Sequence, residues 1–238
     1  MTTTTPPRLD LYAPIHKALR SFMTDTLSRI GRVDVFDGAD MAASLAQLDA
    51  LLALCASHLR HENDFVHPAI EARLPGGAAR IAGEHLQHVA AIDALREDAR
   101  RLADVGDPGQ RQPLALHLYR RLALFVAENF EHMNVEETQH NAALWAHYSD
   151  AELAELHGRL MASIAPAEVL EVARWMVPAL SPAERAGMLN GVKAEMPPHA
   201  FQALVGCVRP HLDAPAWAKL APAIGMAGDP RFALEATR

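Results

Sequence analysis

Histidine and glutamate are the residues of this chain with the clearest chemical potential. The 238 residues include 13 histidines, and histidine is both the commonest metal ligand and the side chain that titrates near neutral pH. Two histidines are followed four residues later by a glutamate, in segments 58–62 (HLRHE) and 132–136 (HMNVE). Positions i and i+4 of a helix share one face about one turn apart. Each pair is therefore suited to bind one cation or to bridge two.

A third pair with the same spacing, His67 with Glu71, has a different predicted environment. His67 follows His58 by nine residues, which at about 100° per residue is half a turn round the helix. Pro68 comes next and disturbs the local backbone. We therefore predict that His67 and Glu71 lie on the surface.

The elements that position these side chains are predicted to be helices, because strand-like alternation is almost absent and Ala, Leu, Glu and Arg dominate the long segments. Breaks at 31–38, 74–77 and 106–113 separate four helices near 13–30, 39–73, 78–103 and 113–147. Their short connections favour an up-down-up-down four-helix bundle. Shorter helices follow near 150–163, 167–178, 182–195, 198–211 and 214–224, with capping boxes at Ser149 and Ser181.

This pattern predicts an all-α fold with three parts: a bundle domain at 10–160, a smaller C-terminal helical module at 165–225, and a flexible tail at 226–238. Each bundle helix carries an apolar stripe at three- and four-residue spacing. The stripes are Leu19, Met23 and Ile30; Leu48, Leu51 and Cys55; Ile81, Ile92 and Leu95; and Leu118, Leu122 and Phe125. We expect them to form the core.

Extending each stripe by whole turns reaches one histidine per helix: His16, His58, His85 and His132. A lone buried histidine is more often satisfied by hydrogen bonds than by a metal. Four histidines and two glutamates in one core are different, because buried carboxylates without partners are costly and a divalent cation compensates them. The sequence therefore predicts a metal site in the bundle. Imidazole and carboxylate without thiolate suit iron, manganese or zinc.

Three segments together resemble the hemerythrin-like HHE cation-binding family: HLRHENDFVHPAIEARLPG, EHLQHVAAIDAL and HMNVEETQHNAALWAHYSDAELAEL. The resemblance covers roughly residues 10–160. It implies a non-heme centre with two iron ions, in which Glu62 and Glu136 bridge the metals. The implied ligands are His16, His58, Glu62, His85, His132 and Glu136, the same six that the helix faces indicate.

The chain departs from oxygen-carrying hemerythrins, which have HxxxH on the third helix and HxxxxD on the fourth. Reversible oxygen carriage is therefore not the favoured function. Glu137 follows His132 by five residues, as in the HxxxxD motif, but it lies about 140° round the helix from His132. Glu136 lies about 40° away, so we favour Glu136 as the ligand. His61, His88 and His140 either complete the coordination or orient a ligand, and each is more often solvent-facing in such a position.

Bulk properties exclude several classes. The net charge is −7, so no basic field attracts nucleic acid or anionic lipid. The start of the chain lacks the pattern of a signal peptide and no stretch reads as apolar enough to span a bilayer, so a cytoplasmic location is expected. Cys55 and Cys207 form no CxxC motif and are expected to pack as small hydrophobes.

Three functions remain open. The first is a binding or sensing protein whose open coordination position takes O2, NO or peroxide, or reports iron supply, with the C-terminal helices contacting a protein partner. The second is a di-iron oxidoreductase acting on peroxide or NO. The third is a structural cation such as zinc. Motifs of hydrolases, kinases and nicotinamide enzymes are missing, so a classical enzyme is the less favoured class and no catalytic residue is assigned.

Overall fold

The computed structural model describes residues 8–229, and every regular element in that range is helical. The all-α prediction is confirmed. The described chain divides into two compact units, one made of residues 8–16 and 22–163, and one made of residues 17–21 and 164–229. Each unit is described by itself. The predicted tail falls largely on residues 230–238, outside the described range.

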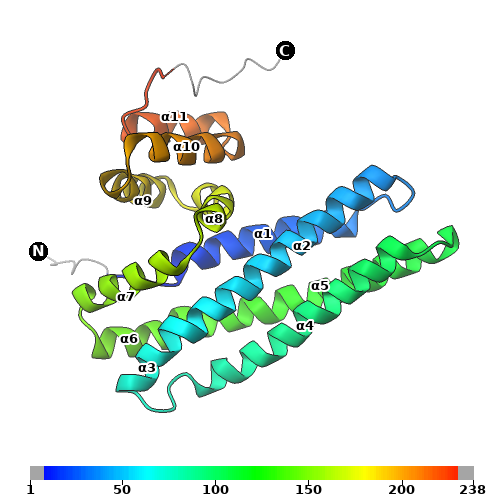
Figure 1. Ribbon diagram of the computed structural model, residues 1–238, viewed down its shortest axis with the longest axis horizontal. Helices are drawn as coiled ribbons and strands as arrows, with labels where there is room; N and C mark the ends of the chain where they lie inside the picture. The colour runs from blue at the N-terminus through cyan, green and yellow to red at the C-terminus, as the bar shows by residue number, and fades with distance from the viewer. Residues whose placement is uncertain (1–7, 230–238) are drawn as a thin grey trace, which may run out of the picture. The chain divides into compact units, whose positions relative to one another are not determined.

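Four long rods form the first unit (Figure 1). Helix α1 spans Ala13–Gly31 and α4 spans Ala79–Asp104. The second rod is α2 (Gly38–His61), a π-helical turn η1 (Glu62–Val66) and α3 (His67–Arg73). The fourth is α5 (Pro108–Val135), a π-helical turn η2 (Glu136–His140) and α6 (Asn141–His147). These bounds agree with the predicted ones within about two residues, except at the start of α5.

Helix α5 begins five residues before the predicted start at Pro113. The side chain of Asp107 accepts a hydrogen bond from the Gly109 amide and caps the helix. Pro108 occupies the first helical position, where a missing N–H costs nothing. Pro113 removes one backbone hydrogen bond in the second turn, and the well-capped helix continues through it.

Contacts between the rods confirm an up-down-up-down four-helix bundle. Arg29 Nε donates to Ser44 Oγ at 3.0 Å near one end of α1 and α2, while the rings of His16 and His58 lie 5.2 Å apart towards the other end. These two helices are therefore antiparallel. Further contacts join α2–η1 to α4 (Asn63 to His85), α4 to α5 (Arg121 to Asp98) and η2 to the N-cap residue of α1 (His140 to Tyr12).

The predicted apolar stripes lie in the bundle core, since all twelve stripe residues are buried. One end of the bundle is closed by a separate apolar cluster that includes Tyr12, Val66, Ile70, Leu144 and Leu153. Leu153 comes from α7 (Asp150–Ser163). The predicted capping box is present there: Ser149 N donates to Glu152 Oε2 at 2.8 Å, and Glu152 N donates to Ser149 Oγ at 3.3 Å.

The two π-helical turns change which side chains face the core. A π turn inserts one residue, so every later side chain is rotated back by about 100° relative to an uninterrupted α-helix. His67 is therefore about 80° from His58 instead of half a turn. The prediction that His67 lies on the surface was wrong: it is 6% exposed and its ring stacks on His85 with centroids 4.8 Å apart.

The second unit contains α8 (Pro166–Ala179), α9 (Pro182–Glu195), α10 (Pro198–Val208), a 3-10 turn (Arg209–His211) and α11 (Ala214–Ala223). Each of the four α-helices has proline in its first turn, and Ser181 forms the predicted capping box with Glu184. The unit has its own apolar core, which includes Val177, Leu189 and Phe201. Cys207 is only partly buried, whereas Cys55 is buried as expected.

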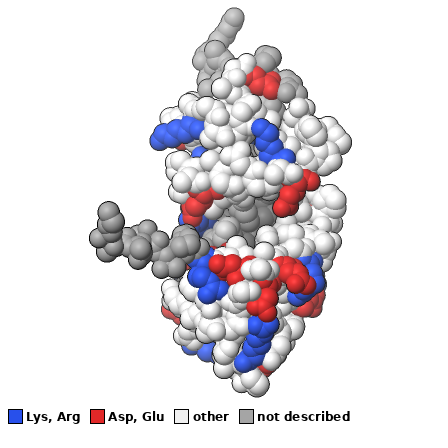
Figure 2. Space-filling model, turned by 90° about the vertical axis from the view of Figure 1, so that its left-hand side faces the viewer, with Lys and Arg blue, Asp and Glu red and all other residues white. Residues whose placement is uncertain are grey.

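One helix, Gly38–Arg73, is long and apolar enough to pass a length-and-composition test for a membrane span. The expectation that no stretch is apolar enough was therefore wrong by that test. The same helix carries partly buried His58 and buried Glu62 and His67 in the bundle, and a core helix of a soluble bundle passes this test as readily. Acidic and basic side chains are interspersed on the face shown in Figure 2.

Candidate metal centre

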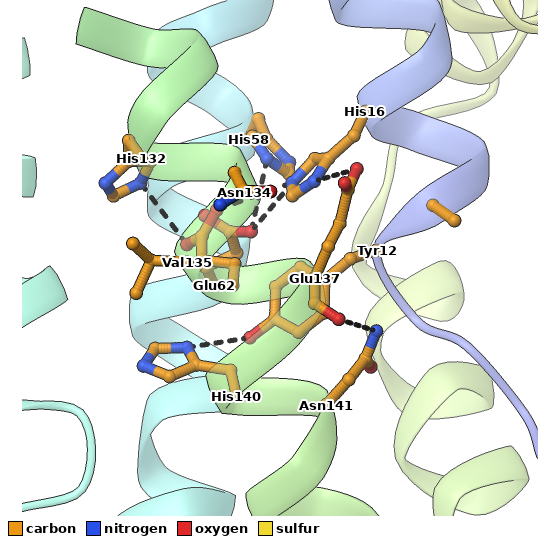
Figure 3. A network of polar contacts seen from close by, with 12 residues as sticks. Tyr12, His16, His58, Glu62, His132, Asn134, Val135, Glu137, His140 and Asn141 are labelled. Atoms are coloured by element: carbon orange, nitrogen blue, oxygen red, sulfur yellow. Dashed lines mark hydrogen bonds and ion pairs between the residues drawn. The ribbon is translucent and has the colours of Figure 1, made fainter.

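A cluster of histidine and glutamate side chains lies in the bundle interior (Figure 3). It contains two overlapping groups whose ligand atoms lie within 4.8 Å of one another. The groups are His16, His58, Glu62 and Glu136, and Glu62, His85, His132 and Glu136. Glu62 and Glu136 belong to both. The structure therefore brings together all six residues that the sequence predicts, with two imidazoles and two shared carboxylates in each group.

Hydrogen bonds on the outer side of the rings fix which nitrogen faces the centre. Nδ1 of His132 donates to Glu84 Oε2 at 2.9 Å, and Nδ1 of His16 donates to Glu137 Oε1 at 3.1 Å. A carboxylate only accepts, so both Nδ1 atoms carry the proton. Nε2 of each ring then faces the interior, where it offers a lone pair once a cation displaces any proton that it holds. This is the tautomer in which metal-bound histidines are usually held by an outer carboxylate or carbonyl.

His85 has the same arrangement, with its Nδ1 donating to Asn63 Oδ1 at 2.8 Å. Its Nε2 lies 3.1 Å from Nε2 of His132. With both Nδ1 atoms protonated, two lone pairs face each other at this distance, which is unfavourable unless a proton or a cation lies beside them. The interior is therefore arranged to donate electron pairs to a positive centre.

The inward-facing atoms have the spacing of metal ligands. Nε2 of His16 lies 3.5 Å from Glu136 Oε2, and Nε2 of His132 lies 3.3 Å from Glu136 Oε1. Nε2 of His58 lies 3.1 Å from Glu62 Oε1. Ligands held at about 2.1 Å from one tetrahedral ion are about 3.4 Å apart, and somewhat closer around an octahedral ion. The contacts therefore fit cation coordination.

Four buried oxygens in the centre have no hydrogen-bond partner. They are both carboxylate oxygens of Glu62 and both of Glu136. Glu136 is fully buried and Glu62 is 3% exposed. These oxygens face imidazole nitrogens at 3.1–3.7 Å, and a buried carboxylate without a hydrogen bond or full charge compensation is costly. The residues present therefore fit a divalent cation, which supplies the missing positive charge.

The pKa values in the metal-free chain also indicate that the centre lacks positive charge. Burial, reinforced by the nearby Glu136, raises the pKa of Glu62 to about 8. Burial alone would lower the pKa of His16, but its contacts with Glu137 and Glu62 outweigh this and raise it to about 9. Without metal, the centre thus holds protons at neutral pH. Cation binding displaces them, so metal uptake releases protons.

The four secondary residues occupy different places. Glu137 lies outside the centre and holds His16, whereas Glu136 is inside. His61 is partly exposed. The expectation that His88 and His140 more often face solvent was wrong, because they are 4% and 3% exposed. The ring of His88 packs edge-on against His132 at 4.7 Å.

Three residues near the centre were not identified from the sequence. Glu84 and Asn63 hold His132 and His85, and Tyr12 contacts His140 through its hydroxyl at 3.1 Å. Each of these contacts joins segments that are far apart in the sequence. No local spacing predicts them, although Glu84 could have been singled out as a carboxylate directly before a candidate ligand.

A helical bundle with histidines and glutamates converging in its core is the arrangement of a cation-binding bundle protein. Residues 9–144 match the family described as Hemerythrin HHE cation binding domain. The match covers more than half of the chain, and the chain belongs to this family. No curated protein and no solved structure gives a significant match.

Proposed function

We propose that the bundle binds two iron ions and uses them to bind or sense a small ligand such as O2, NO or peroxide, or to report iron supply. The observation that carries this proposal is the sharing of Glu62 and Glu136 between two groups of donors. Two carboxylates common to two pairs of histidines are suited to bridge two cations. The donors are nitrogen and oxygen only, which suits iron and leaves manganese or zinc as rivals.

The number of protein donors supports a ligand-binding role. Each ion would receive two imidazole nitrogens and two carboxylate oxygens. A tetrahedral zinc ion is saturated by four donors, whereas a six-coordinate iron ion retains open positions for an external ligand. The centre is deeply buried, with His58 the most exposed of the six side chains at 12%. This burial favours a ligand of a few atoms over a larger substrate.

Metal analysis and spectroscopy test this proposal. The chain is loaded anaerobically with ferrous iron, and ultraviolet–visible spectra are recorded for aerobic and dithionite-reduced protein, then after addition of O2, NO or peroxide. Charge-transfer bands that respond to one of these ligands are expected. Protein that takes up no iron and develops no such bands would sink the proposal.

The same experiment separates the alternatives. Multiple turnovers of peroxide or NO with a supplied reductant would favour a di-iron oxidoreductase. Preferential zinc uptake, with unfolding as the main effect of zinc removal, would favour a structural cation.

The proposal also covers the role of residues 166–223 and the cellular compartment of the protein. We assign the second helical unit to contact with a protein partner that receives the state of the centre, and we place the protein in the cytoplasm, without a nucleic-acid or membrane partner. Crosslinking of iron-loaded and metal-free protein in cell extract tests the first point, since a metal-dependent partner should be captured only in one state.

A further inference from the structure

His67 and His140 form a second feature of the bundle interior that the paired groups do not use. They are the residues after η1 and at the end of η2, so each lies about one turn beyond a shared glutamate. Their rings meet edge to face with centroids 5.5 Å apart. Both are almost completely buried. The two π-helical turns thus bring a pair of imidazoles to the same level of the bundle.

Donor atoms of His67, His140 and Glu136 lie within 4.8 Å of one another. Nε2 of His67 is buried and has no hydrogen-bond partner. Nδ1 of His140 is paired with the Tyr12 hydroxyl at 3.1 Å, which leaves Nε2 of that ring as the nitrogen for another partner. In Figure 3, Tyr12 and His140 face each other below the contacts of His16 and Glu62. This cluster therefore has an unsatisfied His67 nitrogen beside the shared Glu136 carboxylate.

We propose that His67, His140 and Glu136 form a third cation site beside the paired centre, for a first-row divalent ion such as Zn²⁺, Mn²⁺ or Fe²⁺. This inference rests on the proposed paired centre because Glu136 is common to both. Donors around one ion at about 2.1 Å are at most roughly 4.2 Å apart, so atoms within 4.8 Å of one another need to move by at most about 0.6 Å. Water completes the coordination.

The third site binds its ion more weakly than the paired centre. It has three protein donors, and only Glu136 brings negative charge to it. Two neighbouring cations repel a third one in a low-dielectric interior. The site is therefore the last to fill and the first to empty. The apolar cluster around Tyr12, Val66 and Leu144 closes the end of the bundle next to it.

Equilibrium titration of metal-free protein with Zn²⁺, followed by calorimetry and by metal analysis after desalting, tests the site. The wild type should bind two ions tightly and a third more weakly. His67→Phe and His140→Leu replace the imidazoles with apolar groups of similar size, and each variant should lose the weak step and keep the two tight ones. The control His147→Ala changes an exposed histidine of α6 and should keep all three steps.

Crystals soaked with Zn²⁺ give an independent reading, because anomalous scattering should show a third peak between His67 and His140. Two ions in the wild type, or a weak step that survives in both His67→Phe and His140→Leu, would overturn the third site and leave the paired centre intact. Fewer than two tight ions in the wild type would instead contradict the paired centre.

Discussion

Glu84 on α4 holds His132 on α5: the carboxylate Oε2 accepts a hydrogen bond from Nδ1 at 2.9 Å, on the side of the ring that faces away from the centre. This contact fixes the tautomer of His132 and makes its Nε2 a better electron-pair donor. We expect Glu84→Gln to weaken metal binding about 10- to 100-fold, because the amide oxygen keeps the contact but not the charge. Competition with a chelator of known affinity measures this loss.

Glu97→Gln is the matched control for that change. Glu97 lies on the same helix and pairs with Arg100 at 2.6 Å, but it is exposed and far along α4 from the centre. Its replacement should leave metal affinity unchanged. Equal losses in both variants would show that a general change in α4, and not the hold on His132, weakens binding.

Variants that lose a shared ligand should retain less metal than variants that lose an unshared ligand. Glu62 belongs to both groups, so Glu62→Ala should abolish binding of both ions, whereas His132→Ala removes a ligand from one group and should leave roughly half of the tightly bound metal. Metal analysis after desalting measures both. The exposed His147→Ala should bind as the wild type does. Complete retention by Glu62→Ala would contradict the bridging arrangement.

Metal removal should lower the free energy of unfolding by an amount that grows with the logarithm of the metal affinity. A cation present at about 100 times its dissociation constant stabilises the folded state by about 2.7 kcal/mol. Addition of a chelator should therefore lower the melting temperature of the wild type by several degrees. The shift should be absent in Glu62→Ala, which starts without metal. A chelator effect of the same size in Glu62→Ala would mean that the stabilising ion lies elsewhere.

The helix boundaries and core stripes could be predicted because they depend on local periodicity and punctuation. The convergence of the six residues followed from i+4 spacing and from antiparallel packing. The positions of His67 and His140 could not be predicted in this way, since a π-helical turn leaves no periodic signature and shifts the register by about 100°. The contact between Glu84 and His132 depends on the relative axial position of α4 and α5, which the sequence of neither helix determines by itself.

His88 should make the metal-free protein sensitive to acid. Burial, together with the charge of neighbouring His132 and His85, lowers the pKa of His88 to about 4, while Glu84 and Glu136 act in the opposite direction. Below about pH 6.5 the unfolded chain takes up this proton and the folded chain does not. The stability contributed by neutral His88 is therefore complete above pH 6.5 and is lost as the pH falls towards 4.

His88→Leu should remove that loss, because leucine does not titrate and also eliminates the buried, unpartnered Nδ1 atom. Urea unfolding of both metal-free proteins at pH 7.5 and at pH 5.0 measures the effect. The free energy of unfolding of the variant minus that of the wild type should increase by about 1–2 kcal/mol from pH 7.5 to pH 5.0. A difference that stays constant with pH would show that His88 does not resist protonation in the fold.

Arg185 should stabilise the second unit through hydrogen bonds that lysine cannot reproduce. Its guanidinium donates to three carbonyl oxygens at the end of α8, those of Val177 at 2.7 Å, Pro178 at 3.0 Å and Leu180 at 2.9 Å. Arg185 is 6% exposed, so carbonyls that lose their donor are left buried. Arg185→Lys, which keeps the charge but loses the planar fork, should cost about 1–3 kcal/mol.

Hydrogen exchange of residues 166–195 measures this cost locally, because a loss of about 1.4 kcal/mol speeds exchange through opening about tenfold. Arg174→Lys is the control: Arg174 pairs with Glu171 at 2.7 Å near the surface of the same unit, and such a pair contributes at most about 1 kcal/mol. Faster exchange confined to Arg185→Lys is expected. Similar exchange in the two variants would contradict the prediction, because it would mean that the guanidinium contacts do not hold the end of α8.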